Sequence, residues 1–432
     1  MRQRLLHTVD DIGAFKRSVL RWAQRFDEIV WLDSNSHQNS YTSFEALLAV
    51  DGLTAISTDH HNAFEDLKAY QSQVNDWIFG YLSYDLKNDV EALESQNFDG
   101  LEFPELYFFQ PKKIIQIQGS QVEFLYLDMV ADEMQSDFES ISQNDFEEDI
   151  GFQHEQPSIK MRIFKDEYFN KVSLILDHIH QGDIYEVNFC QEFYCEGFDM
   201  NPLPVYERLN AISRPPFATF MKLFGNYVLC ASPERFLRKV GTKIVSQPIK
   251  GTAARSLDPK KDAELKRHLE KDQKERSENV MIVDLVRNDL SKTALKGSVQ
   301  VEELCKVYSF AQVHQMISTV CCEVKKDENP VDIIKNCFPM GSMTGAPKVS
   351  AMQIIEDLES FKRGVYSGAV GYFTPKGDFD FNVVIRSILY NSSKKYLSYA
   401  VGSAITAMSN PEKEYLECLL KAKAMRQVLE EV

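Results

Sequence analysis

The sequence predicts an α+β fold in which large antiparallel β-sheets are packed between helices. Two observations lead to this prediction. Strand-like runs follow one another directly, as they do over residues 227–252, and groups of such runs are separated by helical patterns. The stretch from Gly368 to Tyr390 also has the pattern of a hairpin that turns at Lys376-Gly377, as expected of antiparallel strands.

The composition restricts the class of protein before any motif is considered. The 432 residues carry a net charge of −16, with a pI near 5.1, which disfavours nucleic acid or an anionic membrane as the main partner. None of the eight cysteines belongs to a C-x-x-C pair, which argues against a zinc site or a dithiol motif. We find neither a signal-peptide core at the start nor an apolar run of about 18 residues. We therefore expect a reduced, cytoplasmic enzyme.

An acidic, polar stretch divides the sequence. Lysine and arginine are absent between Lys113 and Lys160, and this gap contains ADEMQSDFESISQNDFEEDIGFQHEQP. Such a composition is typical of a solvated loop or linker. We therefore predict an N-terminal region over residues 1–150, with the acidic linker near 131–159, and a second region over residues 160–432. The N-terminal region is poor in motifs but contains the strand-like runs FDEIVWLD, DWIFGYLSYD and KKIIQIQG.

The elements of the second region follow from periodicity and from capping residues. Apolar residues at helical spacing, with acids before them and a glycine after them, predict a helix over KDEYFNKVSLILDHIHQGD. Asp258 suits the N-cap of one long helix that reaches residue 290, and Pro259 suits its first position. Two more helices are expected, over residues 346–361 and from residue 410 onward. Strands are expected in IYEVNFCQEFYC, YVLCASPERFLRKVGTKIVSQPIKGT and VYSFAQVHQMISTVCCEV.

Two of the predicted helices carry pairs of carboxylates. Glu275 and Glu278 lie three residues apart, and hence on one face, just before the apolar run VMIVDLV. Glu414 and Glu417 repeat this spacing on the last helix. Brought together, the two pairs would form an oxygen-rich site suited to Mg²⁺. Each pair alone is equally typical of a solvated, charged helix face, and the spacing does not say whether the two helices meet.

Several basic side chains could receive an anion. In GSMTGAPKVSAMQ, Lys348 stands at a predicted helix start, where free N–H groups favour an anion, although a plain capped turn explains the same pattern. Arg386 interrupts an apolar strand, so it needs an anionic partner if it is buried; a ligand or a structural ion pair would serve. Lys421 lies one turn after Glu417 on the same face, either as a ligand group or as a solvated lysine.

Three residues are candidates for direct chemistry. Glu234, at a turn between apolar strands, could have a raised pKa and act as a general acid. His314 could hydrogen-bond a leaving group, but a histidine in a strand is also typical of a satisfied core residue. Lys250 ends a strand-like run, before a glycine. Its amine could attack only when neutral, and burial or a nearby cation would lower its pKa; a structural or exposed lysine is the alternative.

Taken together, nine blocks of the sequence resemble the chorismate-utilising enzymes, a family that includes anthranilate, aminodeoxychorismate, isochorismate and salicylate synthases. The blocks occur in the family's order and cover about residues 164–425. They are GDIYEVNFCQEF, ASPERF, PIKGTAAR, ERSENVMIVDLVRNDLSK, VHQMISTV, FPMGSMTGAPKVSAM, YSGAVGYF, VVIRSI and EKEYLECLLKAKA. The resemblance implies an anthranilate synthase component I-like fold with two interlocked subdomains, in which residues 160–432 form the chorismate-binding catalytic domain.

The resemblance also implies roles for the candidate residues. Mg²⁺ would be held by Glu278 and Glu417, with Glu275 and Glu414 contributing directly or through water, and would bind the ring carboxylate of chorismate. Glu234 would protonate the leaving C4 hydroxyl and then act as a base. The other residues would contact the substrate: Tyr366, Arg386 and Gly402 at the enolpyruvyl carboxylate, Lys421 near the metal-bound carboxylate, and Thr252, Gly251 and His314 along the ring.

Lys250 and Glu186 distinguish among the members of the family. Aminodeoxychorismate synthases typically carry PIKG, as this chain does, and anthranilate synthases carry PIAG. The resemblance therefore implies that Lys250 adds at C2 of chorismate with loss of the C4 hydroxyl, and that ammonia then adds at C4 to give 4-amino-4-deoxychorismate, the precursor of p-aminobenzoate and folate. Glu186 replaces the lysine base of the water-using members, which argues against hydration at C2, and also the glutamine usual in ammonia-using members.

The source of ammonia and the rival functions remain to be considered. No G-x-C-x-G elbow surrounds any cysteine, so ammonia would come from solution or from a separate glutamine amidotransferase subunit. The rivals are anthranilate synthase component I, which Lys250 argues against, and a non-catalytic chorismate-binding subunit, which the retained charge cluster argues against. Ser34, in the run WLDSN, is a candidate for a vestigial tryptophan site.

Overall fold

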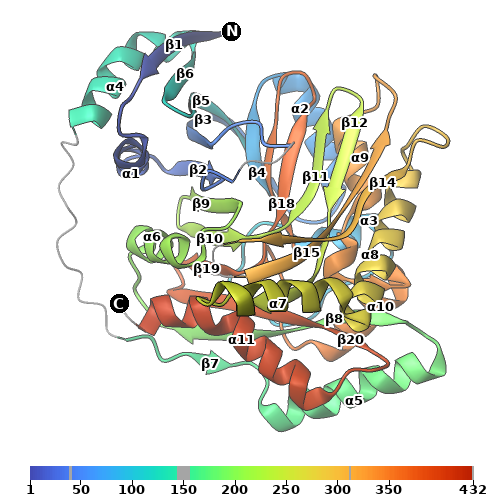
Figure 1. The fold of residues 1–432 in the computed structure, drawn as a ribbon. Helices are drawn as coiled ribbons and strands as arrows, with labels where there is room; N and C mark the ends of the chain where they lie inside the picture. Colours follow the sequence, from blue (N-terminus) through green and yellow to red (C-terminus); the bar gives the residue numbers. More distant parts are fainter. Residues whose placement is uncertain (38–40, 144–155, 311–312, 431–432) are drawn as a thin grey trace.

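Strands dominate the computed structural model, which describes residues 1–37, 41–143, 156–310 and 313–430 (Figure 1). Within these residues every strand pair is antiparallel, and the pairs join all the strands into one hydrogen-bonded network. The strands are β1 (Arg2–Thr8), β2 (Glu28–Asp33), β3 (Ala46–Thr58), β4 (Ile78–Leu82), β5 (Leu106–Gln118), β6 (Gln121–Leu127), β7 (Lys160–Met161), β8 (Glu186–Glu196), β9 (Phe217–Leu223), β10 (Asn226–Ser232), β11 (Arg235–Val240), β12 (Lys243–Gln247), β13 (Ile249–Ala254), β14 (Gln300–Ser309), β15 (Val313–Glu323), β16 (Gly345–Ala346), β17 (Ala369–Phe373), β18 (Phe379–Val383), β19 (Ser387–Asn391) and β20 (Tyr396–Thr406).

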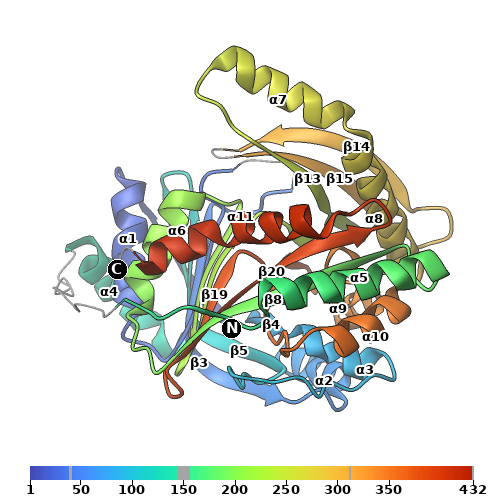
Figure 2. The same ribbon diagram turned by 90° about the horizontal axis from the view of Figure 1, so that it is seen from below.

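The helices lie on the outside of this strand network. They are α1 (Ile12–Ala23), α2 (Ala63–Val74), α3 (Lys87–Val90), α4 (Met134–Gln143), α5 (Lys165–Gln181), α6 (Pro202–Ser213), α7 (Pro259–Lys271), α8 (Gln273–Ser291), α9 (Pro330–Cys337), α10 (Lys348–Leu358) and α11 (Pro411–Glu430), with short 3₁₀ turns at η1 (Tyr84–Leu86), η2 (Asp128–Glu133) and η3 (Gly341–Met343). Figure 2 shows α11 lying across the strand pair β20–β8, beside α5. In the part of the chain that the structure describes, no helix is both long and apolar enough to cross a membrane.

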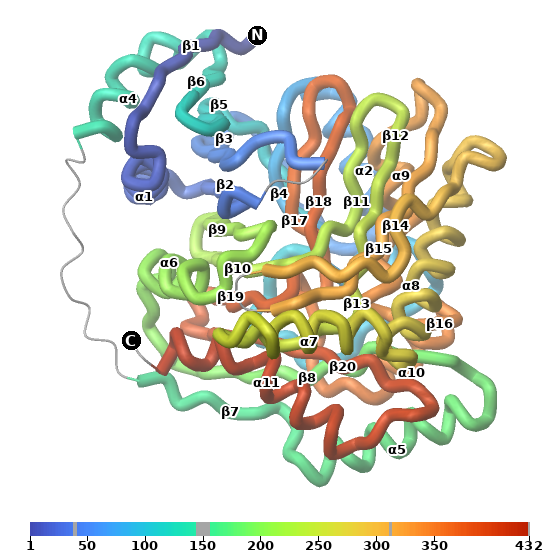
Figure 3. Tube along the Cα trace, viewed as in Figure 1, coloured from blue at the N-terminus to red at the C-terminus, as the bar shows by residue number. Residues whose placement is uncertain are grey.

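Strands of the N-terminal region pair with strands of the second region. β2 pairs with β9, with Val30 opposite Met221, and β4 pairs with β17, with Gly80 opposite Gly371. Figure 3 shows the blue trace of β2 beside the green trace of β9. The predicted α+β fold with large antiparallel sheets is therefore confirmed, and its N-terminal and C-terminal parts share the same strand network. The boundary near residue 150 lies outside the described residues and stays a prediction.

Two apolar cores hold the layers together. The first lies between the strand layers and contains Phe108, Phe373 and Ile282. The second lies under the helices α1, α5, α6 and α11 and contains Trp22 and Cys418. Because Ile282 belongs to the first core, the apolar part of α8 is anchored there. The acidic first turns of the same helix are thereby held at the edge of the core.

The structure corrects three predictions about local structure. Residues 134–143 form α4 instead of a loop, because Met134, Phe138 and Ile141 recur at helical spacing and pack towards the core. The predicted long helix is two helices, since Asp272 has an extended backbone and its side chain caps α8 by accepting from the Glu275 N–H at 3.1 Å. Arg386 lies between β18 and β19 with a φ of +55°, so it is not inside a strand.

Candidate active site

Lys250 lies where the pairing of β13 with β15 becomes irregular. The register shifts between Ile249 and Thr252, so Lys250 and Gly251 form a bulge. Gly251 has a φ of +96°, a conformation that favours glycine, and a Cβ there would lie 3.1 Å from a carboxylate oxygen of Glu275. The amide of the buried Asn279 donates to the Lys250 carbonyl at 3.3 Å and fixes the bulge against α8. The sequence analysis missed this positioning role of Asn279.

The side chain of Lys250 reaches Glu186 on β8. Its Nζ lies 2.7 Å from Glu186 Oε1, and the two side chains are 11% and 1% exposed. Burial alone would lower the pKa of Lys250, but the carboxylates of Glu186, Glu278 and Glu234 outweigh burial and raise the pKa above its ordinary value. Burial or a nearby cation would lower this pKa, but among the described residues the carboxylates decide its direction. The resting amine is an ammonium ion, because carboxylates surround it.

Glu234 provides a buried acid on the neighbouring turn. It follows β10 and is 5% exposed. Burial raises its pKa to about 7, and hydrogen bonds from Ser342 and from the Ile249 N–H, with the charge of Lys250, offset this only in part. The predicted raised pKa is confirmed. A carboxyl group with a pKa near neutrality can both donate and accept a proton at physiological pH.

The two acid pairs come together where α8 meets the start of α11. The ammonium of Lys274 lies 3.6 Å from Glu278 on its own helix and 3.6 Å from Glu414 on α11. Glu275 and Glu417 are close enough for their charges to interact, and this repulsion adds to burial in raising the pKa of Glu275. The question that the spacing left open is thus answered, since the two helices do meet. Lys274 was missed because a lysine in a charged helix gives no distinct signal.

The donor set of this junction suits a hard cation. Burial raises the pKa of Glu278 to about 7, and its Oε1 has no hydrogen-bond partner among the described residues. Those residues contain no group of three or more His, Cys, Asp or Glu side chains arranged to hold a metal ion. Mg²⁺ does not require such a group, because it is commonly held by one or two carboxylates and completes its shell with water and substrate oxygens. The residues therefore fit Mg²⁺. Glu278 is the carboxylate with the clearest place for a cation, because its buried Oε1 has no hydrogen-bond partner among the described residues.

Arg386 is a half-buried cation without an acidic partner among the residues that the structure describes. In the described part of the chain it forms no ion pair, and its only hydrogen bond goes from Nη1 to the Lys421 carbonyl at 3.4 Å. Burial lowers its pKa, and only the more distant charges of Tyr366 and Glu417 oppose this. Within the described residues, Arg386 therefore has no structural ion pair. A half-buried guanidinium that lacks a carboxylate is suited to receive one from a ligand.

Lys421 and Gly402 form the wall next to Arg386. The Lys421 ammonium donates to the Gly402 carbonyl at 2.8 Å and pairs with Glu417 at 2.7 Å, so it is not a solvated lysine. Burial tends to raise the pKa of Glu417, but Lys421 outweighs burial and lowers it. A Cβ at Gly402 would lie 2.7 Å from both Asn188 Nδ2 and the Cys190 thiol, so glycine is required there. The Tyr366 hydroxyl lies 3.8 Å from the same thiol, which joins all the predicted carboxylate-binding residues to one region.

His314 and Thr252 differ in their surroundings. His314 is buried on β15, and its two ring nitrogens contact Asp262 of α7 at 3.1 Å and Ser309 at 2.9 Å. In this conformation neither nitrogen is free for a ligand, and its role along the ring stays a prediction. Asp262, whose pKa a hydrogen bond from Arg255 lowers to about 2, was not predicted, because no local pattern links it to His314. Thr252 is exposed on β13, and its role along the ring also stays a prediction.

The helix start at Lys348 has a structural explanation. Lys348 Nζ lies 2.6 Å from Asp289 and also donates to the carbonyls of Cys337 and Pro339. Because the ammonium is engaged inside the protein, the capped-turn interpretation of this segment is supported over an anion site.

A comparison with known families agrees with this arrangement of residues. The family model described as chorismate binding enzyme matches residues 27–427. This chain belongs to the chorismate-binding enzyme family. The resemblance stated from the nine sequence blocks is therefore confirmed, and the match also extends into the motif-poor N-terminal region.

Relatives within the chorismate-binding family include aminodeoxychorismate synthases. A probable chloroplastic aminodeoxychorismate synthase of Oryza sativa subsp. japonica is 43% identical over 270 residues, which are 62% of this chain but only 30% of the rice protein. Aminodeoxychorismate synthase component 1 of Bacillus subtilis is 32% identical over 364 residues, 81% of this chain and 76% of that protein. The chain thus spans less than a third of the rice relative and about three quarters of the bacterial one.

A solved structure supports the same fold. The crystal structure of anthranilate synthase component I from Streptococcus pneumoniae has a TM-score of 0.76 to this family member at 24% identity, and the superposition covers 90% of this chain and 94% of that one. The predicted anthranilate synthase component I-like fold is therefore confirmed. At this identity the likeness speaks for the fold alone.

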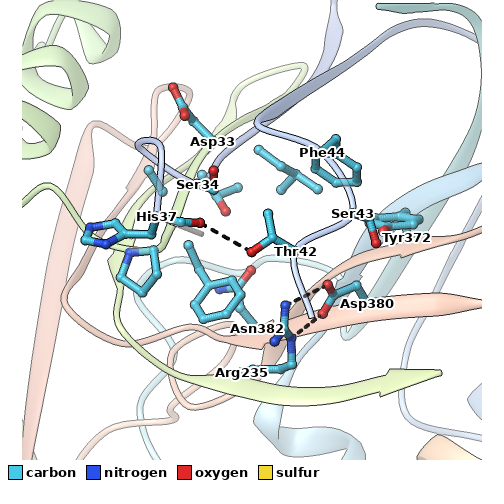
Figure 4. A pocket seen from close by; sticks show the side chains of 15 residues that line it. Asp33, Ser34, His37, Thr42, Ser43, Phe44, Arg235, Tyr372, Asp380 and Asn382 are labelled. Atoms are coloured by element: carbon cyan, nitrogen blue, oxygen red, sulfur yellow. Dashed lines mark hydrogen bonds and ion pairs between the residues drawn. The ribbon is translucent and has the colours of Figure 1, made fainter. Parts of the chain in front are cut away.

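This member of the chorismate-binding family also has a pocket next to β2, with a cavity volume of about 50 Å³. Figure 4 shows Ser34, His37 and Thr42 on one side of it and the Arg235–Asp380 ion pair on the other. The Ser34 hydroxyl is buried without a hydrogen-bond partner among the described residues. Ser34 therefore lies in a pocket, as a vestigial tryptophan site requires, while tryptophan binding itself stays a prediction.

Proposed function

We propose that this chain is the chorismate-using component of an aminodeoxychorismate synthase, which converts chorismate and ammonia to 4-amino-4-deoxychorismate. The observation that carries this proposal is the buried Lys250, held on a bulged strand between Glu186 and Glu234. An amine in such a place is suited to act as a covalent nucleophile. The aminodeoxychorismate synthases among the relatives support the same choice.

Binding of chorismate would use Arg386 and the residues of the wall next to it. Arg386 receives the enolpyruvyl carboxylate, with Tyr366 and the Gly402 backbone beside it, and Lys421 lies near the ring carboxylate. Glu278 and Glu417 are the proposed ligands of Mg²⁺, with Glu275 and Glu414 next to them. When bound there, Mg²⁺ neutralises the ring carboxylate and draws electron density from the ring. Gly251, Thr252 and His314 are proposed to line the ring.

The first half of the reaction forms a bond to Lys250. The amine of Lys250 attacks C2, the two ring double bonds shift, and the bond between C4 and its hydroxyl breaks. Glu234, whose raised pKa of about 7 keeps roughly half of it protonated at neutral pH, gives its proton to the departing oxygen, which leaves as water. The adduct nitrogen remains a secondary ammonium, so it can leave again as a neutral amine.

The second half of the reaction exchanges Lys250 for ammonia. Ammonia attacks C4, the double bonds shift back, and the C2–N bond to Lys250 breaks. Glu234, now a carboxylate, accepts one proton from the added nitrogen and returns to its starting state. A covalent adduct therefore replaces one difficult substitution with two steps that use the same acid.

The supply of ammonia completes the proposal. A separate glutamine amidotransferase subunit would provide it, which the designation "component 1" of the Bacillus subtilis relative supports. We also propose a reducing, cytoplasmic setting, supported by the eight cysteines, which are all buried as free thiols.

The product decides between the candidate functions. The pure chain is incubated with chorismate, Mg²⁺ and an ammonium salt, and the product is identified by mass and fluorescence. We expect 4-amino-4-deoxychorismate; free anthranilate would instead assign anthranilate synthase, and no turnover would favour a non-catalytic subunit. Lys250→Ala should lose most of the activity. Lys243→Ala, on the neighbouring strand β12, is the control and should retain it.

A further inference from the structure

Glu186 is a buried carboxylate that is only half satisfied. It is 1% exposed, and one of its oxygens accepts a hydrogen bond from the Lys250 ammonium at 2.7 Å. The other oxygen, Oε2, has no hydrogen-bond partner among the described residues. Nearly all buried polar atoms in folded proteins are hydrogen-bonded, so an oxygen left free beside a reactive amine needs a functional explanation.

The backbone around Glu186 fixes the position of its carboxylate. Glu186 is the first residue of β8 and lies between two neighbours, with Ala346 of β16 on one side and Thr406 of β20 on the other. A Cβ on Gly345 would lie 2.2 Å from the Glu186 carbonyl, so β16 approaches β8 closely. The backbone of Glu186 is therefore held by strands on both sides, and its side chain starts from a fixed position on a strand, not from a loop.

Three carboxylates face the amine of Lys250, but only one contacts it. Glu186 faces it from β8, Glu234 from the turn after β10, and Glu278 from α8. Among the described residues, only Glu186 forms a hydrogen bond with Nζ. Because the surrounding charges favour the ammonium, which has no lone pair, Lys250 must lose a proton before it can attack. The contacting carboxylate is the group placed to take it.

We propose that Glu186 is the proton-transfer partner of Lys250, taking a proton from Nζ as the amine attacks C2 and returning it when the amine is expelled. This inference rests on the proposed function. Glu186 becomes a carboxylic acid in the first half of the reaction, while Glu234 loses its proton to the leaving hydroxyl. In the second half Glu234 regains a proton from the added ammonia and Glu186 returns its own to Lys250. Both acids and the lysine end as they began, and water is the only by-product.

A merely electrostatic role for Glu186 predicts the opposite effect on the reaction. Glu186 raises the pKa of Lys250, so Glu186→Gln would leave more of the amine neutral at pH 7. If Glu186 served only as a counter-ion, the variant would form the adduct as fast as the wild type or faster. If Glu186 accepts the proton, the variant forms the adduct more slowly although its amine is more neutral.

The experiment measures both properties of Lys250. The protein is incubated with chorismate and Mg²⁺ without ammonia, and adduct on the Lys250 peptide is followed by mass spectrometry from pH 6 to pH 9. Without chorismate, acetylation of Lys250 by a small acylating reagent over the same pH range reports the pKa of the amine. Glu186→Asp is a second variant that keeps an acid at the site.

We expect adduct formation in Glu186→Gln to be about 100-fold slower at pH 7, with faster acetylation. The deficit should shrink as the pH rises, since solvent then removes the proton, and Glu186→Asp should lie in between. Glu105→Gln, which removes a buried carboxylate paired with Lys362 outside the site, is the control for folding and should leave both rates unchanged.

Two results would overturn the inference, and they differ from each other. If Glu186→Gln forms the adduct at the wild-type rate or faster, Glu186 is not the proton acceptor, while the proposed function stands. If the wild-type protein forms product without any adduct on Lys250, or forms no product, the covalent step of the proposed function fails and this inference fails with it.

Discussion

The ammonium of Lys274 lies 3.6 Å from Glu414, and so joins the start of α8 to the start of α11 at the point where a divalent cation is proposed to bind. Lys274 also lies 3.6 Å from Glu278. The protein's own cation therefore partly neutralises the acids, and any metal ion has to compete with it for them.

Lys274→Met should increase the response of the protein to Mg²⁺. Without the ammonium, the acids repel one another in the metal-free protein, and Mg²⁺ binds without a competing charge. We expect the rise in melting temperature on addition of Mg²⁺ to be larger than in the wild type by roughly 2 °C or more. Lys292→Met is a matched control, because Lys292 is 45% exposed at the far end of α8 and Lys274 is 44% exposed. Equal Mg²⁺ responses in both variants would contradict the competition.

Glu234 should make stability depend on pH. Its pKa is about 7 in the folded protein because of burial, against 4.5 ordinarily. Between these values the folded state holds a proton that the unfolded chain has released, so stability falls as the pH rises from about 4.5 to about 7. Glu234→Gln has no titrating carboxyl group and lacks this loss of stability. The free energy of unfolding of the variant minus that of the wild type should therefore increase by on the order of 3 kcal/mol from pH 4.5 to pH 7, as measured by urea denaturation. A constant difference across the range would mean that Glu234 titrates normally.

Arg386→Met should weaken substrate binding without destabilising the protein. Because the structure gives Arg386 no acidic partner in the described residues, its removal breaks no ion pair, and melting temperature should stay equal or rise. The KM for chorismate should increase about 10- to 100-fold, as expected for loss of a charged hydrogen bond. Arg162→Met is the control. Because Arg162 is paired with the buried Glu192 at 2.9 Å, this variant should have a lower melting temperature and an unchanged KM. A destabilised Arg386→Met protein would argue for a structural role.

Gly402→Ala should disturb both packing and the carboxylate-binding wall. The added methyl group would lie 2.7 Å from the Cys190 thiol, so β20 or β8 must shift, at a cost of about 1–3 kcal/mol in the free energy of unfolding. The shift would also move the carbonyl that Lys421 contacts, and KM for chorismate should rise. Gly13→Ala in α1, where the nearest atom would be 3.5 Å away, should be neutral or stabilising by up to about 1 kcal/mol. Similar unfolding curves for the two variants would rule out the close contact.

The sequence contains the information about each local element but not about which elements meet. Helical spacing alone places Glu275 with Glu278, and Glu414 with Glu417, because side chains three residues apart share a face. That the two helices meet depends on the packing of α8 and α11 against different cores, which no local pattern records. The same reason hides the contact between Lys250 and Glu186, which are 64 residues apart.

The wrong local predictions have identifiable causes. The acidic composition of residues 134–143 predicts a loop, but the helical spacing of Met134, Phe138 and Ile141 predicts a helix. The helix forms because these apolar side chains pack towards the core. The break between α7 and α8 depends on Asp272 taking an extended backbone to cap the second helix, and an aspartate inside a charged helical run gives little warning of this. The raised pKa of Lys250 has no sequence signal, because the carboxylates around it come from distant parts of the sequence.

The pairing of β4 with β17 has a consequence for how the protein is made. Gly80 leaves the ribosome long before its partner Gly371 is synthesised, and β2 likewise waits for β9. Until then the edges of the early strands are unpaired, and such edges are prone to associate with other chains. A nascent chain of this protein therefore needs shielding during translation, and a version truncated before β17 should be insoluble even though most of its strands are present.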